Sequence, residues 1–532
     1  MERKILQNKI FLYFTEFFSG MSVMAVELGA SRMLAPFFSS SQIVWTIIIG
    51  TIMIAMALGN LWGGRSADRN PDPDRLYLRI LLAAVWIACI PLLGKYIIAG
   101  VSMLLALFVT HNFLIWAAFL SCMVLFVFPL LLLGTVTPSL AKFTVGSLED
   151  SGKIVGTLGA LNTIGSILGT FLPTFVTIPA VGTSVTFLIF AGILLALCLV
   201  YFLSRRQKKT ACAIAAILFL CCCIWGSSPG FAFWEKNLLV EEESVYNYLQ
   251  VKETDQSIIL STNVMFGVQS IKMKDDGLTG MYYDYAMAAP LLAGVGEDSD
   301  GDVLVLGMGT GTYASQCLNY FSRLRIEGVE IDSKITDLAH RYFDLPQSVP
   351  VATDDGRAFL QSSKQKYDVI LVDAYQDITI PFQLSTVEFF TLVKEHLKDG
   401  GVMVVNMNMY SGHAGSINEY LSDTIRSVFP EVYTAQVSGN TNCELFACNG
   451  TGSLETFHRE VEELDHGELR DMMETVEQEL TAYAGGDDIL TDDKAPVEML
   501  GMKMIDELIH GELNQVHEIF RTEGIHGLMK LL

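Results

Sequence analysis

Long apolar segments in the first 230 residues restrict the possible folds of this chain more than any other feature. A stretch of about 20 apolar residues can cross the hydrocarbon core of a bilayer as a helix. Seven segments are candidate spans: 10–34, 42–64, 78–100, 113–137, 155–179, 183–203 and 211–226. The apolar stretch that contains the third of them extends over 78–110 and would also accommodate two helices, so seven or eight spans are predicted. Residues 1–230 are therefore expected to form a multi-pass α-helical membrane domain.

Basic residues cluster in four polar segments around these spans: MERK at the start, GGRSADR at 63–69, AKFTVGSLEDSGK at 141–153 and RRQKK at 205–209. Segments rich in Lys and Arg favour the cytoplasmic side of a membrane. If all four are cytoplasmic, seven spans are required and the C-terminal part lies outside. An even number would place that part inside but would move RRQKK to the other face, so both topologies stay open.

Several residues in the apolar half suggest specific contacts. Glu27 and Arg32 lie in or near the first span, where ionisable residues mark either a transport pathway or a buried pair. Gly165 and Gly169 form a GxxxG pattern, which allows two helices to pack closely. Asn162 precedes them and is a candidate for a polar contact between helices or for lining a pore.

Charge is divided unequally along the chain. The net charge is −23 overall, but residues 1–230 carry +7 and residues 231–532 carry −30. Nucleic-acid binding needs a cationic surface, so no nucleic-acid partner is predicted. An acidic domain suits a small cationic substrate, and it also serves solubility alone.

A soluble part is expected from about residue 231. Short alternating runs predict a small β-rich region over 231–300. Over 301–455, five strand-like segments alternate with helical ones, which predicts a doubly wound, Rossmann-like α/β domain. The acidic residues 456–532 are expected to form a helical tail. The five segments are DVLVLG, RIEGVEID, SVPVATDD, YDVILVDAY and VMVVNMN.

Glycines follow the first strand of the α/β region. Gly307, Gly309 and Gly311 let the backbone approach a ligand closely at the start of a helix, where N–H groups point outward. The spacing lacks the third glycine of a dinucleotide motif. A nucleoside ligand without a required pyrophosphate therefore fits better than a dinucleotide.

Acidic residues follow the next three strands. Glu330 ends the second strand and can accept hydrogen bonds from both ribose hydroxyls. Asp355, followed by Gly356, ends the third strand, where a carboxylate can accept the adenine amino group. S-adenosylmethionine and its relatives fit this set, which is typical of the methyltransferase type of this fold. Asp373 ends the fourth strand, where a carboxylate can hold a cationic amine and accept its proton.

These segments together resemble the spermidine synthase (aminopropyltransferase) family, and especially bacterial membrane proteins that fuse a transporter-like helical region to such a domain. The enzyme-like part covers roughly 240–450. The resemblance rests on VLVLGMGTGT, VEIDSKITDLAHRYF, DDGRAFL, KYDVILVDAYQDITIPFQLSTVEFF, FGVQS and MYYDYAMAAPLL, with MAVELGASRMLAP near the start and ILTDDKAPVEML near the end.

The resemblance implies transfer of an aminopropyl group from the co-substrate decarboxylated S-adenosylmethionine to a diamine such as putrescine, without a metal. It implies that Asp373 acts as the base and that Gln269 joins the nucleoside-binding residues. It also implies substrate binding by Tyr282, Tyr375 and Asp377. The expected setting is the bacterial plasma membrane, with the lipid bilayer, a small cationic amine and a possible second copy of the chain as partners. By this resemblance the enzyme domain would be cytoplasmic.

Two departures from the family pattern keep alternatives open. Thr310 stands where the glycine motif of the family carries an aspartate that contacts the aminopropyl end of the donor. Gln376 stands where the enzymes have a second aspartate in the fourth-strand loop. A methyltransferase that uses ordinary S-adenosylmethionine, or a transporter with a non-catalytic domain that binds a polyamine or nucleoside, is therefore also considered.

Overall fold

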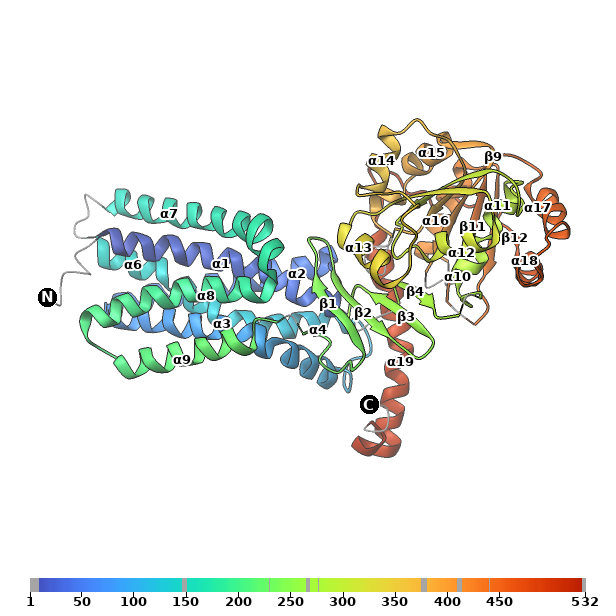
Figure 1. Cartoon of the computed structure of the whole chain (residues 1–532). Coiled ribbons are helices and arrows are strands. Elements are labelled where there is room, and N and C mark those ends of the chain that lie inside the picture. The colour runs from blue at the N-terminus through green and yellow to red at the C-terminus, as the bar shows by residue number, and fades with distance from the viewer. Residues whose placement is uncertain are drawn as a thin grey trace.

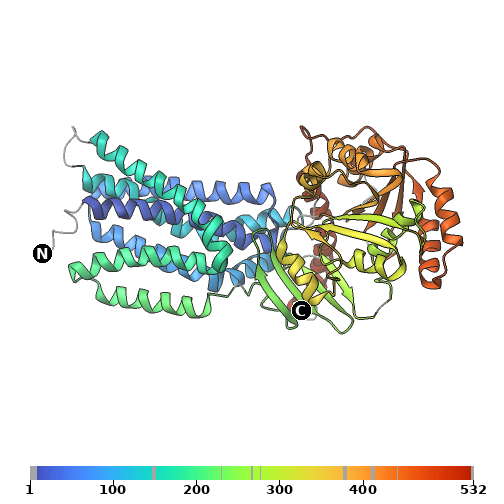
Figure 2. The ribbon, with the colours of Figure 1, turned by 45° about the horizontal axis from the view of Figure 1, so that its top comes forward.

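The computed structural model describes residues 9–145, 151–228, 230–264, 268–275, 277–374, 380–408, 414–439 and 441–528. A bundle of long helices and an α/β part lie end to end (Figures 1 and 2). The four domain ranges given above stay predictions.

Helices build the N-terminal part up to Trp225. Its elements are α1 (Lys9–Phe38), α2 (Gln42–Arg69), α3 (Pro73–Leu105), α4 (Phe113–Cys122), the π-helix η1 (Met123–Val127), α5 (Phe128–Gly134), α6 (Val136–Thr144), α7 (Ser151–Leu172), the π-helix η2 (Pro173–Thr177), α8 (Ile178–Arg205) and α9 (Lys209–Trp225).

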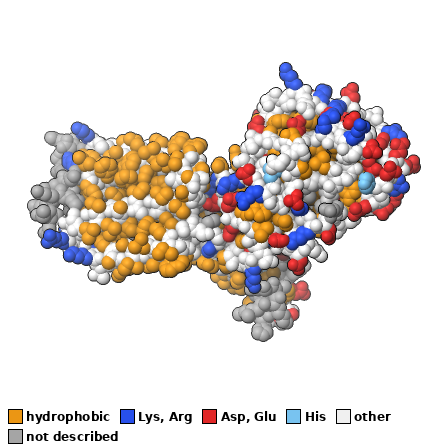
Figure 3. All heavy atoms as spheres, viewed as in Figure 1, with side chains coloured by type: hydrophobic (Ala, Val, Ile, Leu, Met, Phe, Trp, Pro, Cys, Tyr) orange, Lys and Arg blue, Asp and Glu red, His pale blue; other side chains and the backbone are white. Residues whose placement is uncertain are grey.

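Five helical stretches among the described residues are long and apolar enough to cross a membrane, and α9 is a shorter apolar helix. The last long stretch, 151–205, is broken at Gly182, whose φ of 79° and ψ of 170° are not helical. The predicted spans 155–179 and 183–203 lie on either side of this break, and both arms run along the bundle (Figure 1). The side of the bundle seen in Figure 3 is largely apolar, as a surface in contact with lipid would be.

Close packing of α7 on α1 explains the GxxxG pattern. A Cβ atom on Gly165 would lie 2.1 Å from the Phe17 carbonyl oxygen, and one on Gly169 would lie 2.1 Å from the Met21 carbonyl oxygen. Asn162 Nδ2 donates a hydrogen bond of 2.9 Å to Glu16 Oε1, so the structure favours its role as a polar contact between helices.

Arg32 points to the α/β part rather than to Glu27. Its guanidinium donates to the backbone carbonyl oxygens of Ser244, at 3.5 Å, and Val245. Among the described side chains, no ion pair joins Arg32 to Glu27. The first span therefore ends in a contact with the β-rich region.

The β-rich region forms a four-stranded antiparallel sheet in the order β1-β2-β3-β4, followed by two short helices. The prediction of a small β region before the α/β domain is confirmed. Its elements are β1 (Leu238–Glu243), β2 (Tyr248–Glu253), β3 (Ser257–Ser261), β4 (Ser270–Met273), α10 (Tyr282–Ala286) and α11 (Ala288–Leu292).

A second sheet has eight strands in the order β12-β10-β11-β9-β8-β5-β6-β7, and β5 to β9 pair in parallel. This confirms the doubly wound α/β fold. Its elements are β5 (Gly301–Leu306), α12 (Thr312–Tyr320), β6 (Leu324–Val329), α13 (Ser333–Tyr342), β7 (Val351–Ala352), α14 (Gly356–Ser362), β8 (Tyr367–Val372), η3 (Phe382–Leu384), α15 (Val387–Glu395), β9 (Leu397–Met407), α16 (Ile417–Val428), β10 (Glu431–Gln436), β11 (Cys443–Cys448) and β12 (Thr481–Ala482).

The C-terminal helices take part in three hydrophobic cores. α17 (Ser453–Glu462) and α18 (Gly467–Glu479) bury Phe457 and Met473 against one face of the large sheet. The long helix α19 (Val497–Leu528) crosses the junction between the two parts of the molecule (Figure 1). Its Met504 belongs to the core on the other face of the sheet, whereas its Ile509 belongs to the core of the bundle.

Candidate active site

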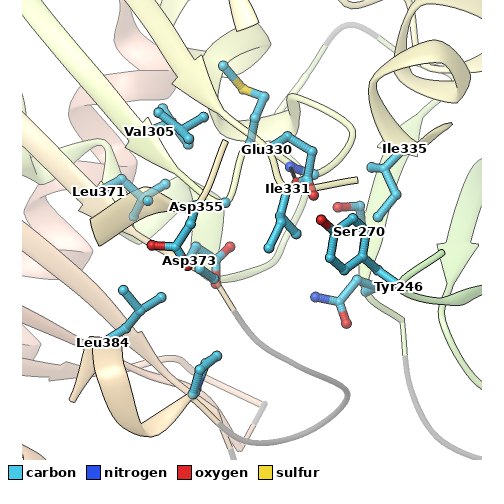
Figure 4. A pocket seen from close by; sticks show the side chains of 18 of the residues that line it. Tyr246, Ser270, Val305, Glu330, Ile331, Ile335, Asp355, Leu371, Asp373 and Leu384 are labelled. Carbon is cyan, nitrogen blue, oxygen red and sulfur yellow. Dashed lines mark hydrogen bonds between the residues drawn. The ribbon is translucent and has the colours of Figure 1, made fainter. Parts of the chain in front are cut away.

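Four neighbouring strands end at the same edge of the large sheet and place the predicted residues together. The parallel strands β8, β5, β6 and β7 lie side by side, so their carboxyl ends meet there. Gly307, Glu330, Asp355 and Asp373 follow these strands and line one cavity of about 310 Å³. Figure 4 shows this cavity, with Tyr246 and Ser270 across it from Asp355 and Asp373.

The glycine loop after β5 requires residues without a side chain. Gly307 has φ of 86°, and a Cβ atom there would lie 2.6 Å from the Asp373 carbonyl oxygen. Gly309 has φ of 54°, and its N–H donates a hydrogen bond of 2.9 Å to Glu330 Oε2. L-residues with side chains rarely adopt such φ values. The loop therefore lies tightly against two of the predicted acidic residues.

Gly311 does not line the cavity, although the sequence predicted it as a nucleoside-binding residue. It is the N-cap of α12 with φ of 80°, and a Cβ atom there would lie 2.4 Å from Leu345 Cδ1. Its role in this structure is to turn the chain into the helix. Gly356, in contrast, lines the cavity at the start of α14.

Glu330 is held by backbone donors on two sides. Its Oε2 accepts from Gly309 and its Oε1 accepts a hydrogen bond of 3.0 Å from the Asp332 N–H. Burial raises the pKa of the Glu330 carboxyl, and these hydrogen bonds oppose the rise. Because the side chain is only 7% exposed, its orientation toward the cavity is fixed before any ligand binds.

Asp355 has two tasks. Its Oδ1 caps α14 by accepting hydrogen bonds from the backbone N–H groups of Arg357, at 3.0 Å, and Ala358, at 2.9 Å. It also lines the cavity beside Asp354. The capping explains why the carboxylate stands at this edge, because an N-cap residue holds its side chain over the first turn of the helix.

Asp373 lies in a network of polar side chains. Tyr282 Oη donates a hydrogen bond of 2.6 Å to its Oδ2, and Asn406 Nδ2 donates one of 3.2 Å to its Oδ1. Burial raises the pKa of the Asp373 carboxyl to about 7, and the two hydrogen bonds oppose that rise. A carboxylate with this pKa can take up a proton near neutral pH.

The β-rich region supplies the opposite wall. Gln269, which the sequence predicted, lines the cavity, and its carbonyl oxygen accepts a hydrogen bond of 3.4 Å from Tyr283 Oη. Tyr246 and Asn247 come from the turn between β1 and β2. Tyr246 and Asn247 were not predicted, because nothing local to the chain indicated which turn would face the edge of the α/β sheet.

The resemblance implied three substrate-binding residues: Tyr282, Tyr375 and Asp377. Tyr282 does not line the cavity itself but contacts Asp373 from behind. Tyr375 and Asp377 lie outside the described residues. Thr310 is 1% exposed, and its hydroxyl lies 3.2 Å from that of Thr312. Within the described part of the chain, no group of three or more His, Cys, Asp or Glu side chains is arranged to hold a metal ion.

Comparison with known proteins places the chain in a family. The spermine/spermidine synthase domain matches residues 287–443. The chain is 53% identical over 349 residues to a probable polyamine aminopropyl transferase of Bifidobacterium longum, covering 62% of this chain and 77% of that protein. It is 30% identical over 221 residues to a polyamine aminopropyltransferase of Vibrio vulnificus, covering 40% of this chain and 72% of that protein.

A solved structure is also similar. A probable spermidine synthase from Corynebacterium glutamicum is 19% identical, with 48% of this chain and 97% of that chain covered and a TM-score of 0.36. The long and close sequence matches above are the stronger finding. The chain belongs to the spermine/spermidine synthase family of polyamine aminopropyltransferases.

Proposed function

We propose that this protein transfers the aminopropyl group of decarboxylated S-adenosylmethionine to an amine acceptor such as putrescine. The observation that carries the proposal is the position of Asp373, a carboxylate of raised pKa at the edge of a cavity suited to a nucleoside. Family membership supports the reaction class, and the cavity supports the choice of residues.

The nucleoside would be held at the ends of three strands. Glu330 would accept the ribose hydroxyls, and Asp355 would accept the adenine amino group through the oxygen that does not cap α14. Gln269 would contact the nucleoside from the β-rich wall. The close approach of Gly307 and Gly309 leaves room for the sulfur-bearing end near Asp373.

The transfer itself is a substitution at carbon. The lone pair of a neutral amine attacks the carbon next to the sulfonium sulfur, so an N–C bond forms. The C–S bond breaks, its electron pair goes to sulfur, and methylthioadenosine leaves. The attacking nitrogen gives its proton to Asp373, which Tyr282 and Asn406 hold in place.

We further propose that the helical bundle anchors the enzyme in a membrane. Its long apolar helices and largely apolar surface support this. The ends of α6 and α8 and the starts of α7 and α9 lie at the end of the bundle away from the α/β part (Figure 1). Exposed basic residues lie around that end: Arg65, Arg69, Arg75, Arg206, Lys208 and Lys209.

Because basic loops favour the cytoplasm, this charge distribution supports a topology with the α/β part on the opposite side. In whole cells, a membrane-impermeant maleimide is expected to label Ser438→Cys in the α/β part, at a position in a described turn. Labelling of Lys208→Cys instead would contradict this topology.

A methyltransferase activity is the second candidate, and the uncharged Thr310 at the glycine loop favours it. Without an anion at this position, the aminopropyl end of the decarboxylated donor has one ionic partner fewer, and the site loses one reason to select it over ordinary S-adenosylmethionine. The two functions differ in the group that is transferred, so one assay separates them.

The experiment uses the full-length protein purified in detergent. It is incubated with putrescine and either decarboxylated or ordinary S-adenosylmethionine, and the products are identified by mass spectrometry. We expect spermidine and methylthioadenosine from the decarboxylated donor, and a decrease of roughly 10²- to 10⁴-fold in Asp373→Asn. A methylated amine from the ordinary donor would establish the second candidate, and no product from either donor would reject both.

A further inference from the structure

Glu444 is a buried carboxyl group without a partner. It is the second residue of β11 and is 0% exposed, and neither carboxylate oxygen has a hydrogen-bond partner among the described residues. Buried polar groups are nearly always hydrogen-bonded, and a buried charge is costly unless it is paired. Burial, and then the charge of Asp373, raise the pKa of the Glu444 carboxyl. A group of this kind needs a cation or a proton to be stable.

The sheet places Glu444 in line with the reacting edge. Glu444 pairs with Asn406 on β9, and Val405 on β9 pairs with Val372, the residue before Asp373. Asn406 in turn donates its hydrogen bond to Asp373. Neighbouring strands lie about 4.8 Å apart, so the backbones at Glu444 and Asp373 are separated by roughly 10 Å.

Tyr313 connects Glu444 to the cavity. It comes from α12, lines the cavity and is only 2% exposed. Phe446, two residues from Glu444 and therefore on the same face of β11, packs in the same hydrophobic core as Tyr313, so Glu444 and Tyr313 lie on one side of the sheet. Burial, then the neighbouring Cys317 and the charge of Glu444, raise the pKa of the Tyr313 hydroxyl. Leu371 also lines the cavity, and we call the part of the cavity next to Tyr313 its inner end.

We propose that Glu444 supplies the negative charge for an alkylammonium group held at the inner end of the cavity, beside Tyr313. The inference rests on the proposed function, because both substrates of that reaction carry such a group. One is the aminopropyl end of the donor, and the other is the second nitrogen of a diamine acceptor. With bonds near 1.5 Å, the two nitrogens of an extended four-carbon diamine lie about 6 Å apart. A diamine of this length fits between a base and a counter-charge whose backbones are roughly 10 Å apart.

Glu444 can influence an ammonium group at a distance because the inner end of the cavity has low polarity. Charges interact more strongly where water is excluded than at the surface. Glu444 can therefore act on an ammonium group without direct contact, through the wall that Tyr313 forms. It would replace the negative charge that Thr310 does not provide.

The test measures binding rather than turnover, by calorimetry on the full-length protein and on Glu444→Gln. One pair of ligands is decarboxylated S-adenosylmethionine and methylthioadenosine, which lacks the ammonium group. The other pair, measured with methylthioadenosine present, is putrescine and butylamine, which lacks the second ammonium group. We expect Glu444→Gln to weaken the binding of decarboxylated S-adenosylmethionine or putrescine, the members with the additional ammonium group, about tenfold or more, and to change the affinity of the matched partner less than twofold. The pair that responds identifies the source of the ammonium group.

Two further variants support the interpretation. Glu444→Asp keeps the charge and is expected to retain the preference for the ammonium-bearing ligand. Cys443→Ser changes the neighbouring buried residue, which belongs to the core on the other face, and is expected to leave all four affinities unchanged. If Glu444→Gln does not fold, a Tyr313→Phe variant that keeps Glu444 must still prefer the ammonium-bearing ligand.

Equal affinities in Glu444→Gln and the wild type for all four ligands would overturn the inference, and so would equal losses within each pair. Failure of the proposed function would instead appear as binding without product in the incubation described above. The two failures are therefore distinguishable.

Discussion

The backbone N–H of Val264 donates a hydrogen bond of 2.9 Å to the carbonyl oxygen of Pro36, near the end of α1. Val264 follows β3, and Gln269 at the cavity directly precedes β4. Arg32, one turn earlier on α1, donates to the carbonyl oxygens of Ser244 and Val245, directly before Tyr246 of the same cavity. The first helix of the bundle therefore supports both loops that form the β-rich wall.

Removing the Arg32 contact should weaken donor binding more than catalysis. Hydrogen bonds to charged groups contribute about 1.5–3 kcal/mol, so Arg32→Met is expected to raise the Kd of methylthioadenosine about tenfold while kcat changes less than threefold. Isothermal calorimetry and steady-state kinetics measure the two effects. Arg79→Met is the control, because Arg79 donates to Ser66 within the bundle. Equal effects of both variants would contradict a specific link to the cavity.

The pH dependence of the rate should reveal Asp373 as the base. An aliphatic amine has a pKa near 10.4, so below this pH the fraction of neutral amine rises about tenfold with each pH unit. For this reason alone, log kcat/KM for the acceptor is expected to rise with pH with a slope of one. Below the pKa of Asp373, about 7, the carboxyl is protonated and cannot accept a proton, which adds a second unit of slope. A slope of one throughout pH 5.5 to 9 would exclude Asp373 as the base.

The same pKa affects stability with a definite sign. The folded state raises the pKa of Asp373 from 3.8 to about 7, so between these values it holds a proton that the unfolded state releases. Stability is therefore lost as the pH rises through this range. Asp373→Asn should melt at a higher temperature than the wild type at pH 8, and the difference should disappear near pH 4.

Glu330 should be required for donor binding. Its carboxylate is fixed by the N–H groups of Gly309 and Asp332, and loss of its charge is expected to raise the Kd of methylthioadenosine about 10- to 100-fold in Glu330→Gln. The control is Glu327→Gln in β6, the strand that precedes Glu330; the Glu327 carboxylate accepts a hydrogen bond of 2.6 Å from Tyr367 away from the cavity. A similar loss in both variants would indicate a general effect on β6.

The contact between α1 and α7 should be sensitive to a single methyl group. In Gly169→Ala the new Cβ would lie 2.1 Å from the Met21 carbonyl oxygen, so the helices must separate, at a cost of about 1–3 kcal/mol. Gly156→Ala is the matched control, because a Cβ there meets nothing within 4 Å. Thermal unfolding in detergent should show a lower midpoint for Gly169→Ala only.

Local patterns in the sequence predicted the strands and the strand-end residues well. Gly307, Glu330, Asp355 and Asp373 each directly follow an apolar run, and parallel strands bring such positions to one edge whatever the loops do. The antiparallel strands β10 to β12 and the exact end of α15 were not predicted. The strand predicted at VMVVNMN begins earlier, at Leu397, directly after α15 ends at Glu395, because pairing with β8 extends the strand backward.

Polar residues inside buried strands were a signal that the sequence analysis did not use. Asn406 and Glu444 interrupt the apolar runs VMVVNM and CELFAC; Asn406 donates a hydrogen bond to Asp373, and Glu444 pairs with Asn406 on the next strand. Their function depends on sheet order, which places β11 next to β9 although β10 separates them in the chain. Contacts between the β-rich turns and α1 also depend on tertiary placement and could not be read from periodicity.

The position of α19 couples the thermal unfolding of the α/β part to that of the helical bundle. Met504 fills the sheet core while Ile505, the next residue, fills the bundle core. If heating unfolds either core, α19 loses its packing there and its contacts with the other core are weakened. The α/β part and the helical bundle are therefore expected to unfold at similar temperatures. A single cooperative transition would follow for a protein that, by composition, looks like two independent ones.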